Sequence, residues 1–599
     1  MPSFNIPLPR PVRPLRELVI LAIACALLAG CAGGQPKPEA IESPQNEPET
    51  TVPGELQAAA PEAEDRSNLP KQDLTETILY EFLLAEIAGQ RGNTGLAAQA
   101  YVDLAKRTRD PRIARRATEI ALYVGMSGAA IEAARIWYEA EPDSQRPLQA
   151  LAGLLVNAGR YDEALPLLKK LLAASPSGPG DGFSQLNRTL GGAQDKKAAL
   201  KFVQGLAEDY PQLPQARFAV AQAAASAGED PLALAEIRKA SQLRPDWEAA
   251  VLLEAQLLLR KSADDALALL TRYLQKHPEA REVRLNYARM LVTQKRFADA
   301  RGEFQKLLAD YPDNTDVTFA VALLSLQLDD YAVAESNLRR LLDSNYRDKS
   351  SVRLYLGQIA EEQKNFPEAL RWYGEIDSGD QYLPAQIRYA QVLSKQGKLE
   401  AARAHLHQVN ARDGEQRVQL VLAEAQLLRE ANQSQAAFDL IQQALDRLPN
   451  NPDLLYDYAM LAEKVERMDI LESSLRKLIE LRPEHAHAYN ALGYSLADRN
   501  QRLPEARDLI EKALKLTPDD AFIVDSMGWV LYRMGDLKNA LGYLRRAFDG
   551  RPDPEIAAHL GEVLWALGER DEAEKVWRDA ARKSPDNETL VNTIKRLKR

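Results

Sequence analysis

Cysteine is almost absent from this chain, which contains only Cys25 and Cys31 among 599 residues. Long apolar runs are scarce as well. The run from Leu18 to Leu28 has eleven residues, fewer than the roughly 20 that a helix needs to span a bilayer. The sequence therefore predicts neither a fold held together by disulfides nor a transmembrane helix in this run.

The motifs of common enzyme classes are also missing. The sequence has no P-loop, no dinucleotide glycine fingerprint, no HExxH and no GxSxG. His405 and His407, like His485 and His487, are two residues apart, and on a helix such side chains point about 200° apart, which prevents them from sharing a metal ion. We therefore interpret the six histidines as solvated and predict a protein that is not an enzyme, with no metal, cofactor or small-molecule substrate.

Positive charge is in deficit over most of the chain. The formal net charge is −10, and residues 1–30 carry three arginines and one glutamate, so the remaining chain has a net charge of −12. Proteins that bind nucleic acid carry a basic stripe or patch, which this sequence lacks. We therefore predict no nucleic-acid partner and no affinity for anionic lipid headgroups.

The first 30 residues have the features of a bacterial export signal. Three arginines precede the apolar run, and small residues follow it. The segment Leu28-Ala29-Gly30-Cys31 resembles the lipobox of bacterial lipoproteins, in which the signal peptidase cuts before a cysteine that then receives a diacylglycerol and an N-acyl chain. The resemblance implies that Cys31 is a lipid anchor and that Cys25 is removed with residues 1–30. The alternative is an ordinary signal peptide with a chance cysteine.

The position after the cysteine bears on location. Ala32, not aspartate, follows Cys31, which resembles the outer-membrane sorting pattern of enteric-type bacteria. Several acyl chains together hold a protein stably at a membrane, whereas one binds only marginally. We therefore expect the chain to be anchored in the outer membrane and to face the periplasm, with exposure on the cell surface left open.

Residues 31–72 have the composition of a disordered tether. The segment from Ala32 onward carries seven prolines, eight acidic residues and hardly any large apolar side chain. Such a segment buries too little apolar surface to offset its chain entropy. A flexible coil of this length spans about 35 Å, so we expect the domain behind it to hang away from the membrane.

The rest of the chain repeats one unit. Three late segments align at Gly493, Gly528 and Gly561, and their closing prolines Pro518, Pro552 and Pro585 are 34 and 33 residues apart. This pattern resembles the tetratricopeptide repeat, in which helix A, a tight turn and helix B are followed by a proline. Extending the register backwards predicts an all-α solenoid, a superhelix of about fifteen helix-turn-helix units over residues 73–588. The small residue of helix A is expected where helix B crosses closely.

Two segments depart from this pattern. Residues 177–192 are rich in glycine where a helix A should stand, so we expect a loosened or distorted repeat there, with a hinge as one alternative. Residues 589–599 are expected to end a capping helix. Their basic residues most simply complement the C-terminal end of that helix, and a functional basic contact is the alternative.

The family resemblance also indicates a binding face. In tetratricopeptide repeats, helix A lines the concave side, and its positions 2, 5, 9 and 12 point inward. Exposed aromatic side chains among amides and acids suit the capture of a protein, although Trp529 and Trp565 have the alternative of packing between units. The predicted face lacks the lysines and arginines of a carboxylate clamp. Its residues in three late units are His487, Asn490, Tyr494 and Ala497, then Phe522, Asp525, Trp529 and Tyr532, and then Glu555, Ala558, Glu562 and Trp565.

The combination of lipobox, acidic tether and about fifteen repeats resembles one family of pseudomonad outer-membrane lipoproteins. That family binds and activates a periplasmic carboxyl-terminal processing protease and presents cell-wall cross-link hydrolases to it. The resemblance implies a membrane-tethered adaptor whose partners are that protease and its substrates. The alternative is a structural scaffold lipoprotein of an exopolysaccharide, pilus or secretin export machine.

Overall fold

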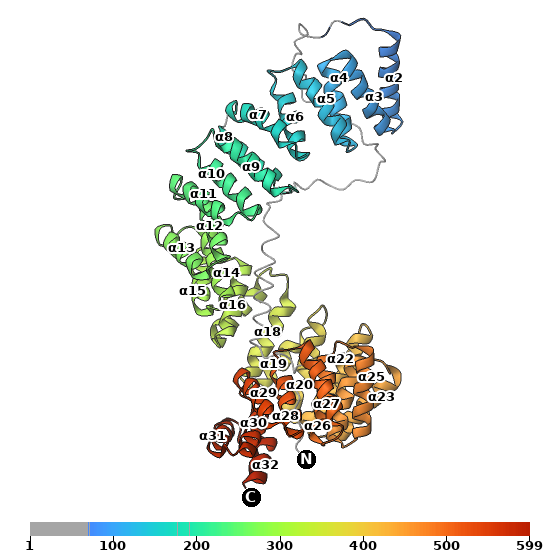
Figure 1. Ribbon diagram of the computed structural model, residues 1–599, viewed down its shortest axis with the longest axis vertical. Coiled ribbons are helices and arrows are strands. Elements are labelled where there is room, and N and C mark those ends of the chain that lie inside the picture. The colour runs from blue at the N-terminus through green and yellow to red at the C-terminus, as the bar shows by residue number, and fades with distance from the viewer. Residues whose placement is uncertain (1–69, 71, 176–177, 191, 599) are drawn as a thin grey trace. The chain divides into compact units, whose positions relative to one another are not determined.

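The computed structural model describes residue 70 and residues 72–175, 178–190 and 192–598 (Figure 1). Within these residues all regular structure is α-helical, in thirty-one helices labelled α2 to α32, and no strand is present. The all-α prediction is confirmed. The predicted signal peptide, Cys31 and nearly all of the predicted tether lie outside the described residues. Among the helices that are described, none has both the length and the apolar character that crossing a membrane requires.

The helices fall into two compact units, divided between Pro312 and Asp313. The helices of the first unit are α2 (Glu76–Gln90), α3 (Thr94–Thr108), α4 (Pro111–Tyr123), α5 (Ser127–Ala140), α6 (Gln145–Asn157), α7 (Tyr161–Ala173), α8 (Pro179–Leu190), α9 (Lys196–Ala207), α10 (Pro214–Ser226), α11 (Asp230–Leu243), α12 (Glu248–Leu259), α13 (Ala263–Lys276), α14 (Arg281–Thr293) and α15 (Phe297–Asp310).

The second unit continues the same succession. Its helices are α16 (Thr315–Gln327), α17 (Tyr331–Asp343), α18 (Lys349–Glu362), α19 (Phe366–Gly374), α20 (Tyr382–Lys395), α21 (Leu399–Gln408), α22 (Gly414–Glu430), α23 (Ser434–Arg447), α24 (Pro452–Lys464), α25 (Met468–Leu481), α26 (Ala486–Asp498), α27 (Leu503–Leu516), α28 (Ala521–Arg533), α29 (Leu537–Gly550), α30 (Pro554–Leu567), α31 (Arg570–Lys583) and α32 (Glu588–Leu597). The pairs α2/α3 to α30/α31 are the fifteen helical hairpins that the sequence predicts, and α32 follows them.

Local sequence explains where the helices begin and turn. Asn451, Asp520 and Asn587 cap α24, α28 and α32, and each side-chain oxygen accepts a hydrogen bond from a backbone N–H of the first turn. Most turns between paired helices contain a residue with positive φ, such as Gly535 at +89° and Gly568 at +87°. Glycine reaches this conformation without steric cost, so these two turns are encoded locally.

The glycines of helix A lie where helix B crosses closely, as the repeat alignment predicts. A Cβ atom on Gly493 would lie 2.8 Å from the backbone oxygen of Ala506 and 2.6 Å from the side chain of Ile510. A Cβ on Gly561 would lie 2.0 Å from the indole Nε1 of Trp577. Because neither backbone nor indole can retreat easily, the close crossing requires a residue without a side chain.

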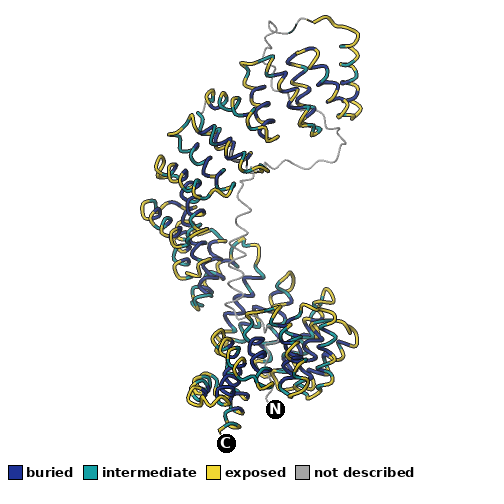
Figure 2. The backbone as a smooth tube through the Cα atoms, viewed as in Figure 1, coloured by how far each residue is buried: buried dark blue, intermediate teal, exposed yellow. Residues whose placement is uncertain are grey.

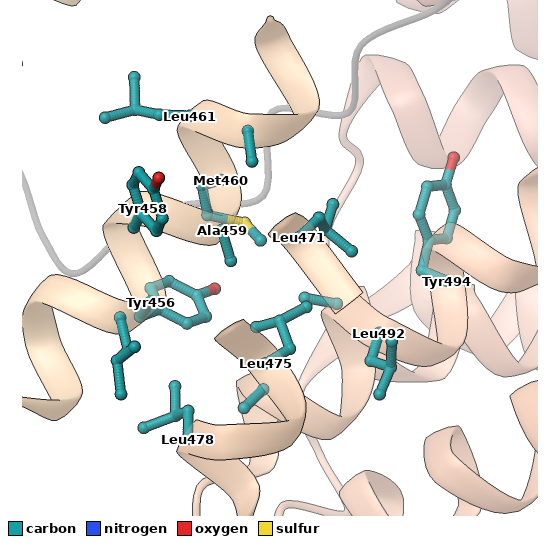
Figure 3. Packing of buried hydrophobic residues seen from close by; sticks show 14 of the residues in the cluster. Tyr456, Tyr458, Ala459, Met460, Leu461, Leu471, Leu475, Leu478, Leu492 and Tyr494 are labelled. Carbon is teal, nitrogen blue, oxygen red and sulfur yellow. The ribbon is translucent and has the colours of Figure 1, made fainter. Parts of the chain in front are cut away.

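The buried apolar side chains of each unit form several clusters, which lie between paired and successive helices. Figure 2 shows buried backbone facing neighbouring helices and exposed backbone facing outward. In the cluster of Figure 3, Leu471, Leu475 and Leu478 of α25 pack against the apolar side chains of α24 and against Leu492 of α26. Each fully buried leucine stabilises the fold by about 1.5–3 kcal/mol. Each repeat is therefore held by its neighbours rather than by a core of its own.

Helix α8 forms within the glycine-rich segment. The packing of its repeat differs from that of the other repeats. Helix α8 packs mainly against α10, while α9 packs against α7 and α10, whereas helices A and B of the other repeats pack on one another. At Gly182 an added Cβ would lie 2.4 Å from Leu172. The glycine permits this altered approach, and a hinge role stays a prediction.

The last helix packs on the final repeat and forms ion pairs with it. Leu590 and Thr593 are buried, and α32 packs on α30 and α31. Arg596 pairs with Glu562 of α30 at 2.6 Å, and Lys598 pairs with Glu574 of α31 at 2.9 Å. The sequence did not indicate these two ion pairs, and the complementing of the helix end by basic residues stays a prediction.

Candidate functional site

The predicted binding face lies on the first helices of the last repeats. Helix α28 contacts both α26 and α30 directly, and α24 precedes them in the same register. We call this surface the inner face and define it by ten side chains of α24, α26, α28 and α30. They are Tyr456, Glu463, Asn490, Tyr494, Asp498, Asp525, Trp529, Glu555, His559 and Glu562.

A buried ion pair lies at the centre of the inner face. The imidazole Nδ1 of His559 is 2.9 Å from one carboxylate oxygen of Asp525 and 3.1 Å from the other. Both side chains are almost fully buried, with residue exposures of 3% and 0%. Burial by itself lowers the pKa of His559, but the adjacent Asp525 carboxylate outweighs it and raises the pKa above its usual value. The interpretation of all histidines as solvated is therefore wrong for His559.

Aromatic rings enclose this ion pair. The indole of Trp529 stacks on the imidazole of His559 with ring centroids 4.2 Å apart, and the ring of Tyr494 lies 6.1 Å from the imidazole. A cation held over an indole face is stabilised by the ring quadrupole. Trp529 therefore packs between repeats, which is the alternative given for it in the sequence analysis, because its side chain joins α28 to α30.

The predicted exposure of several residues of the predicted binding face is wrong. Trp529 and Tyr494 are each 4% exposed and Phe522 is 7% exposed. Asn490, Asp525 and Glu562 are buried as well. The physical reason visible in the contacts is that the side chain of one repeat covers the side chain of the next, as His559 covers Trp529. Whether any of these residues binds a partner stays a prediction.

Tyr532 and Trp565 are partly exposed, in better agreement with the prediction. The hydroxyl of Tyr532 donates a hydrogen bond to Glu562 at 3.2 Å. The indole of Trp565 packs against that of Trp577, with centroids 5.6 Å apart, and the guanidinium of Arg570 lies over it. Both aromatic side chains therefore contact a neighbouring helix while keeping part of their surface accessible.

Within the described chain, Glu463 lacks the close cation that Asp525 and Glu562 of the inner face have in His559 and Arg596. Burial raises the pKa of Glu463 to about 7, and the Asp498 and Glu555 carboxylates add to this effect. Burial likewise raises the pKa of Asp457, its neighbour on α24, to about 6 although Arg429 lies 3.7 Å away and opposes the rise. The inner face thus holds negative charge in a desolvated environment, which is costly unless a cation is near.

Several buried polar atoms of the inner face have no hydrogen-bond partner. These are both side-chain amide atoms of Asn490, the hydroxyl of Tyr456 and the indole Nε1 of Trp529. Native proteins pair most buried polar groups, so each unpaired one requires an explanation. Sequence reasoning missed Tyr456, Glu463 and His559, although Tyr456 shares the register of Asn490 and Asp525.

The other histidines differ in how many contacts they make with neighbouring residues. His405 stacks on Tyr389 at 4.3 Å and contacts Gln386, and His485 accepts a hydrogen bond from the backbone of Ala488 at the start of α26. His407 remains largely exposed beside Glu424. Across the part of the chain that the structure describes, no group of three histidine, cysteine or acidic side chains is arranged to hold a metal ion.

Comparison with known families identifies the fold class of this surface. Models described as tetratricopeptide repeat match residues 148–181, 257–324, 320–382, 472–521 and 526–588. The TPR repeat-containing protein PA4667 of Pseudomonas aeruginosa is 38% identical over 491 residues, which cover 82% of each chain. The chain therefore belongs to the family of tetratricopeptide repeat proteins, whose solenoids are protein-binding scaffolds.

More distant relatives match over part of their length. The cellulose synthase operon protein C of Pseudomonas fluorescens is 24% identical over 456 residues, which cover 66% of this chain and 33% of the relative. The aspartyl/asparaginyl beta-hydroxylase of Mus musculus is 26% identical over 253 residues, which cover 38% of this chain and 33% of the relative. This chain spans about a third of either protein.

Proposed function

We propose that this protein is a membrane-tethered adaptor that recruits and activates a periplasmic carboxyl-terminal processing protease and presents cell-wall hydrolases to it. The observation that carries the proposal is the succession of fifteen repeats in one chain, because such a solenoid offers an extended protein-binding surface and no catalytic group is needed. The adaptor role comes from the resemblance to pseudomonad lipoproteins. The 38% identity to a repeat protein of Pseudomonas aeruginosa supports the protein-binding scaffold on which the proposal is built.

Tethering gives the adaptor a physical advantage. We propose that Cys31 is acylated, that residues 31–72 form a flexible tether, and that the protein faces the periplasm from the outer membrane. Two partners held on one scaffold meet at a high effective concentration without any new contact between them. An adaptor therefore accelerates degradation by bringing protease and substrate together, while the chain itself performs no chemistry.

The proposal is tested by reconstitution. The protease, a cross-link hydrolase and the mature chain are purified separately, and loss of the hydrolase is followed over time. We expect slow degradation by the protease alone, no degradation by this protein alone, and degradation at least tenfold faster when all are combined. Unchanged protease activity together with no co-purification of the two proteins would show that the adaptor proposal is wrong.

A structural scaffold in an export machine is the second candidate. The similarity to cellulose synthase operon protein C of Pseudomonas fluorescens favours it, although it covers only a third of that protein. The two candidates differ in their partners. An export scaffold is encoded among synthesis and secretion genes and its deletion blocks secretion, whereas deletion of the adaptor raises the level of cell-wall hydrolases.

A further inference from the structure

Exposed apolar side chains gather on the first helix of the described chain. We call this surface the N-terminal face. Beyond the first two repeats such side chains are exposed one at a time along the sequence, as Leu481 and Leu516 are at the ends of α25 and α27. A single exposed leucine is ordinary, whereas a contiguous apolar patch marks a site of interaction. The N-terminal face consists of Leu74, Leu79, Tyr80, Phe82, Leu83, Ile87 and Leu96.

The N-terminal face is exposed because α2 has a neighbouring helix on one side only. Ala85 and Ala88 are its buried residues, and they face α3. No other described helix makes more than marginal contact with α2, which Figure 2 shows as largely exposed. In later repeats the first helix also packs on the second helix before it, as α24 does on α23 and α30 on α29. The end repeat of a solenoid needs a polar outer face to stay soluble, and α2 lacks one.

The side chains that point away from α3 form one stripe along α2. Residues four, seven and eleven apart share a helix face, so Glu76, Tyr80, Leu83 and Ile87 lie along one line. Tyr80 is 66% exposed, and Leu83 and Ile87 are 47% and 46% exposed. Arg91 is the exposed C-cap residue of the helix. Neither Glu76 nor Arg91 forms an ion pair with a described residue. The apolar stripe therefore has a free acid at one end and a free base at the other.

This distribution of charge is complementary to itself. When two α2 helices lie antiparallel with their midpoints after Leu83, Glu76 of each copy is opposite Arg91 of the other, and Tyr80 is opposite Ile87. Each residue then meets its counterpart reciprocally, as a twofold axis requires. A parallel pair would instead place Glu76 beside Glu76 and Arg91 beside Arg91. The charges therefore favour the antiparallel arrangement.

The area of the N-terminal face is sufficient for a specific contact. At roughly 200 Å² for a fully exposed large apolar residue, its seven side chains expose about 700 Å² on each chain. Two such faces together would cover up to about 1,400 Å², which lies within the size range of specific protein interfaces. A surface of this size at the low end of the range gives a dissociation constant on the order of 10 µM.

Two other occupants fit the N-terminal face less well. Helix α2 carries Glu76, Glu81 and Glu86 and no basic residue, whereas helices that lie on membranes are rich in lysine and arginine. Residues 32–69 carry hardly any large apolar side chain, so this segment offers little that could cover the face. A second copy supplies both the apolar area and the opposite charges.

We propose that the N-terminal face binds the N-terminal face of a second copy of this chain, with the two α2 helices antiparallel. The dimer covers the open end of the first unit and leaves the inner face of the last repeats uninvolved. This inference goes beyond the proposed function and does not depend on it. The dimer would also give each assembly two binding scaffolds, which increases avidity for an oligomeric partner.

The first test measures the association state by sedimentation. The reference protein is the full chain with Cys31→Ser, so that no acyl chain contributes to association. We expect a monomer–dimer equilibrium with a dissociation constant on the order of 10 µM. Tyr80→Glu/Leu83→Glu should weaken it at least tenfold. The matched control is Leu481→Glu/Leu516→Glu, which places the same charges at exposed leucines of α25 and α27 and should change it by less than twofold. Thermal unfolding establishes that all the proteins are folded.

The second test establishes the orientation of the helices. Glu76→Arg and Arg91→Glu should each weaken the dimer at least twofold, and the double variant should restore it, because the ion pairs reform with their signs exchanged. Leu83→Cys adds one thiol to a chain that otherwise retains only Cys25. Residues 83 of the two copies lie next to each other in the antiparallel pair, so mild oxidation should link them rapidly. Gln90→Cys should link slowly, since its two copies are about 20 Å apart.

The outcomes decide between the possible occupants. A reference protein that stays monomeric at about 100 µM, tenfold above the expected constant, overturns the inference. A dimer that Tyr80→Glu/Leu83→Glu leaves intact also overturns it, because association then uses another surface. Rapid linking through Gln90→Cys, or no rescue by the double charge reversal, excludes the antiparallel pair. Binding of the monomer to phosphatidylethanolamine–phosphatidylglycerol vesicles that is lost in Tyr80→Glu/Leu83→Glu would assign the face to the membrane instead.

Discussion

The indole of Trp529 stacks on the imidazole of His559, with ring centroids 4.2 Å apart and planes inclined by 23°. The two residues come from the first helices of successive repeats, α28 and α30. This contact joins the repeats on the inner face, while the paired second helices join them on the other side. Trp529 is therefore part of the structural connection between the repeats, and a partner that touches the inner face also acts on that connection.

The stacking predicts that Trp529→Ala destabilises the second unit. Truncating a buried tryptophan lowers the free energy of unfolding by about 3–5 kcal/mol, because the burial of the side chain is lost and a cavity is left behind. Thermal and urea unfolding followed by circular dichroism measure the loss. The control is Tyr123→Ala, since Tyr123 is 84% exposed and its truncation should change stability by less than about 0.5 kcal/mol. An unchanged melt for Trp529→Ala would show that the indole is not structural.

The buried ion pair predicts that stability depends on pH. The pKa of His559 is raised in the folded protein by Asp525, so the folded state binds a proton that the unfolded chain releases near pH 6.5. The contribution of the protonated His559 to the free energy of unfolding is fully present below pH 6.5. It is lost as the pH rises through the raised pKa of the folded protein, by at most about 1.4 kcal/mol per pH unit. Urea titrations from pH 5 to 9 measure this slope. His559→Gln should flatten it, and an equally steep slope in that variant would contradict the assignment.

Glu463 predicts a stabilising substitution. Burial raises its pKa to about 7, so the folded protein loses stability as the pH rises from the ordinary glutamate value of about 4.5 through 7. Glu463→Gln removes this cost and should stabilise the second unit at pH 8 by up to about 3 kcal/mol. At pH 4, where the carboxyl is protonated in both states, the substitution should be nearly neutral. Equal effects at both pH values would show that charge is not the cause.

The close helix crossing predicts that Gly561→Ala is destabilising. The new methyl group would lie 2.0 Å from Nε1 of Trp577, and overpacking of this kind costs about 1–3 kcal/mol. Gly542→Ala is the matched control, because its methyl meets nothing within 4 Å on helix α29. That substitution should stabilise by about 0.5–1 kcal/mol through helix propensity. A neutral Gly561→Ala would mean that Trp577 moves aside freely.

The lipid anchor predicts the location of a single-residue variant. Cys31→Ser removes the thiol that receives the diacylglycerol, so this protein should fractionate with the soluble periplasm while the wild type fractionates with the outer membrane. Metabolic labelling with a radioactive or clickable fatty acid should mark the wild type but not Cys31→Ser. Cys25→Ser is the control and should keep both the label and the membrane location. Membrane association of Cys31→Ser would contradict the anchor.

The sequence by itself determined the fold class, because each repeat encodes its own elements locally. Proline and capping residues start the helices, residues with positive φ turn them, and small residues such as Gly493 and Gly528 fix where paired helices cross. The repeat register also placed the predicted binding face on the first helices, at positions that do not include Asp498 and His559. Within 177–192 it predicted a distorted repeat, although α8 forms there despite its glycines.

Only the tertiary structure decided what the inner-face positions do. Register tells which way a side chain points from its own helix, but its burial depends on how closely the next repeat approaches. That approach follows from packing contacts between helices about 34 residues apart in sequence. The pairing of His559 with Asp525, the burial of Trp529 and the isolation of Glu463 all arise from it. For this reason Trp529, Tyr494 and Phe522 lie buried although exposure was predicted, while Tyr532, Trp565 and Glu463 remain partly accessible.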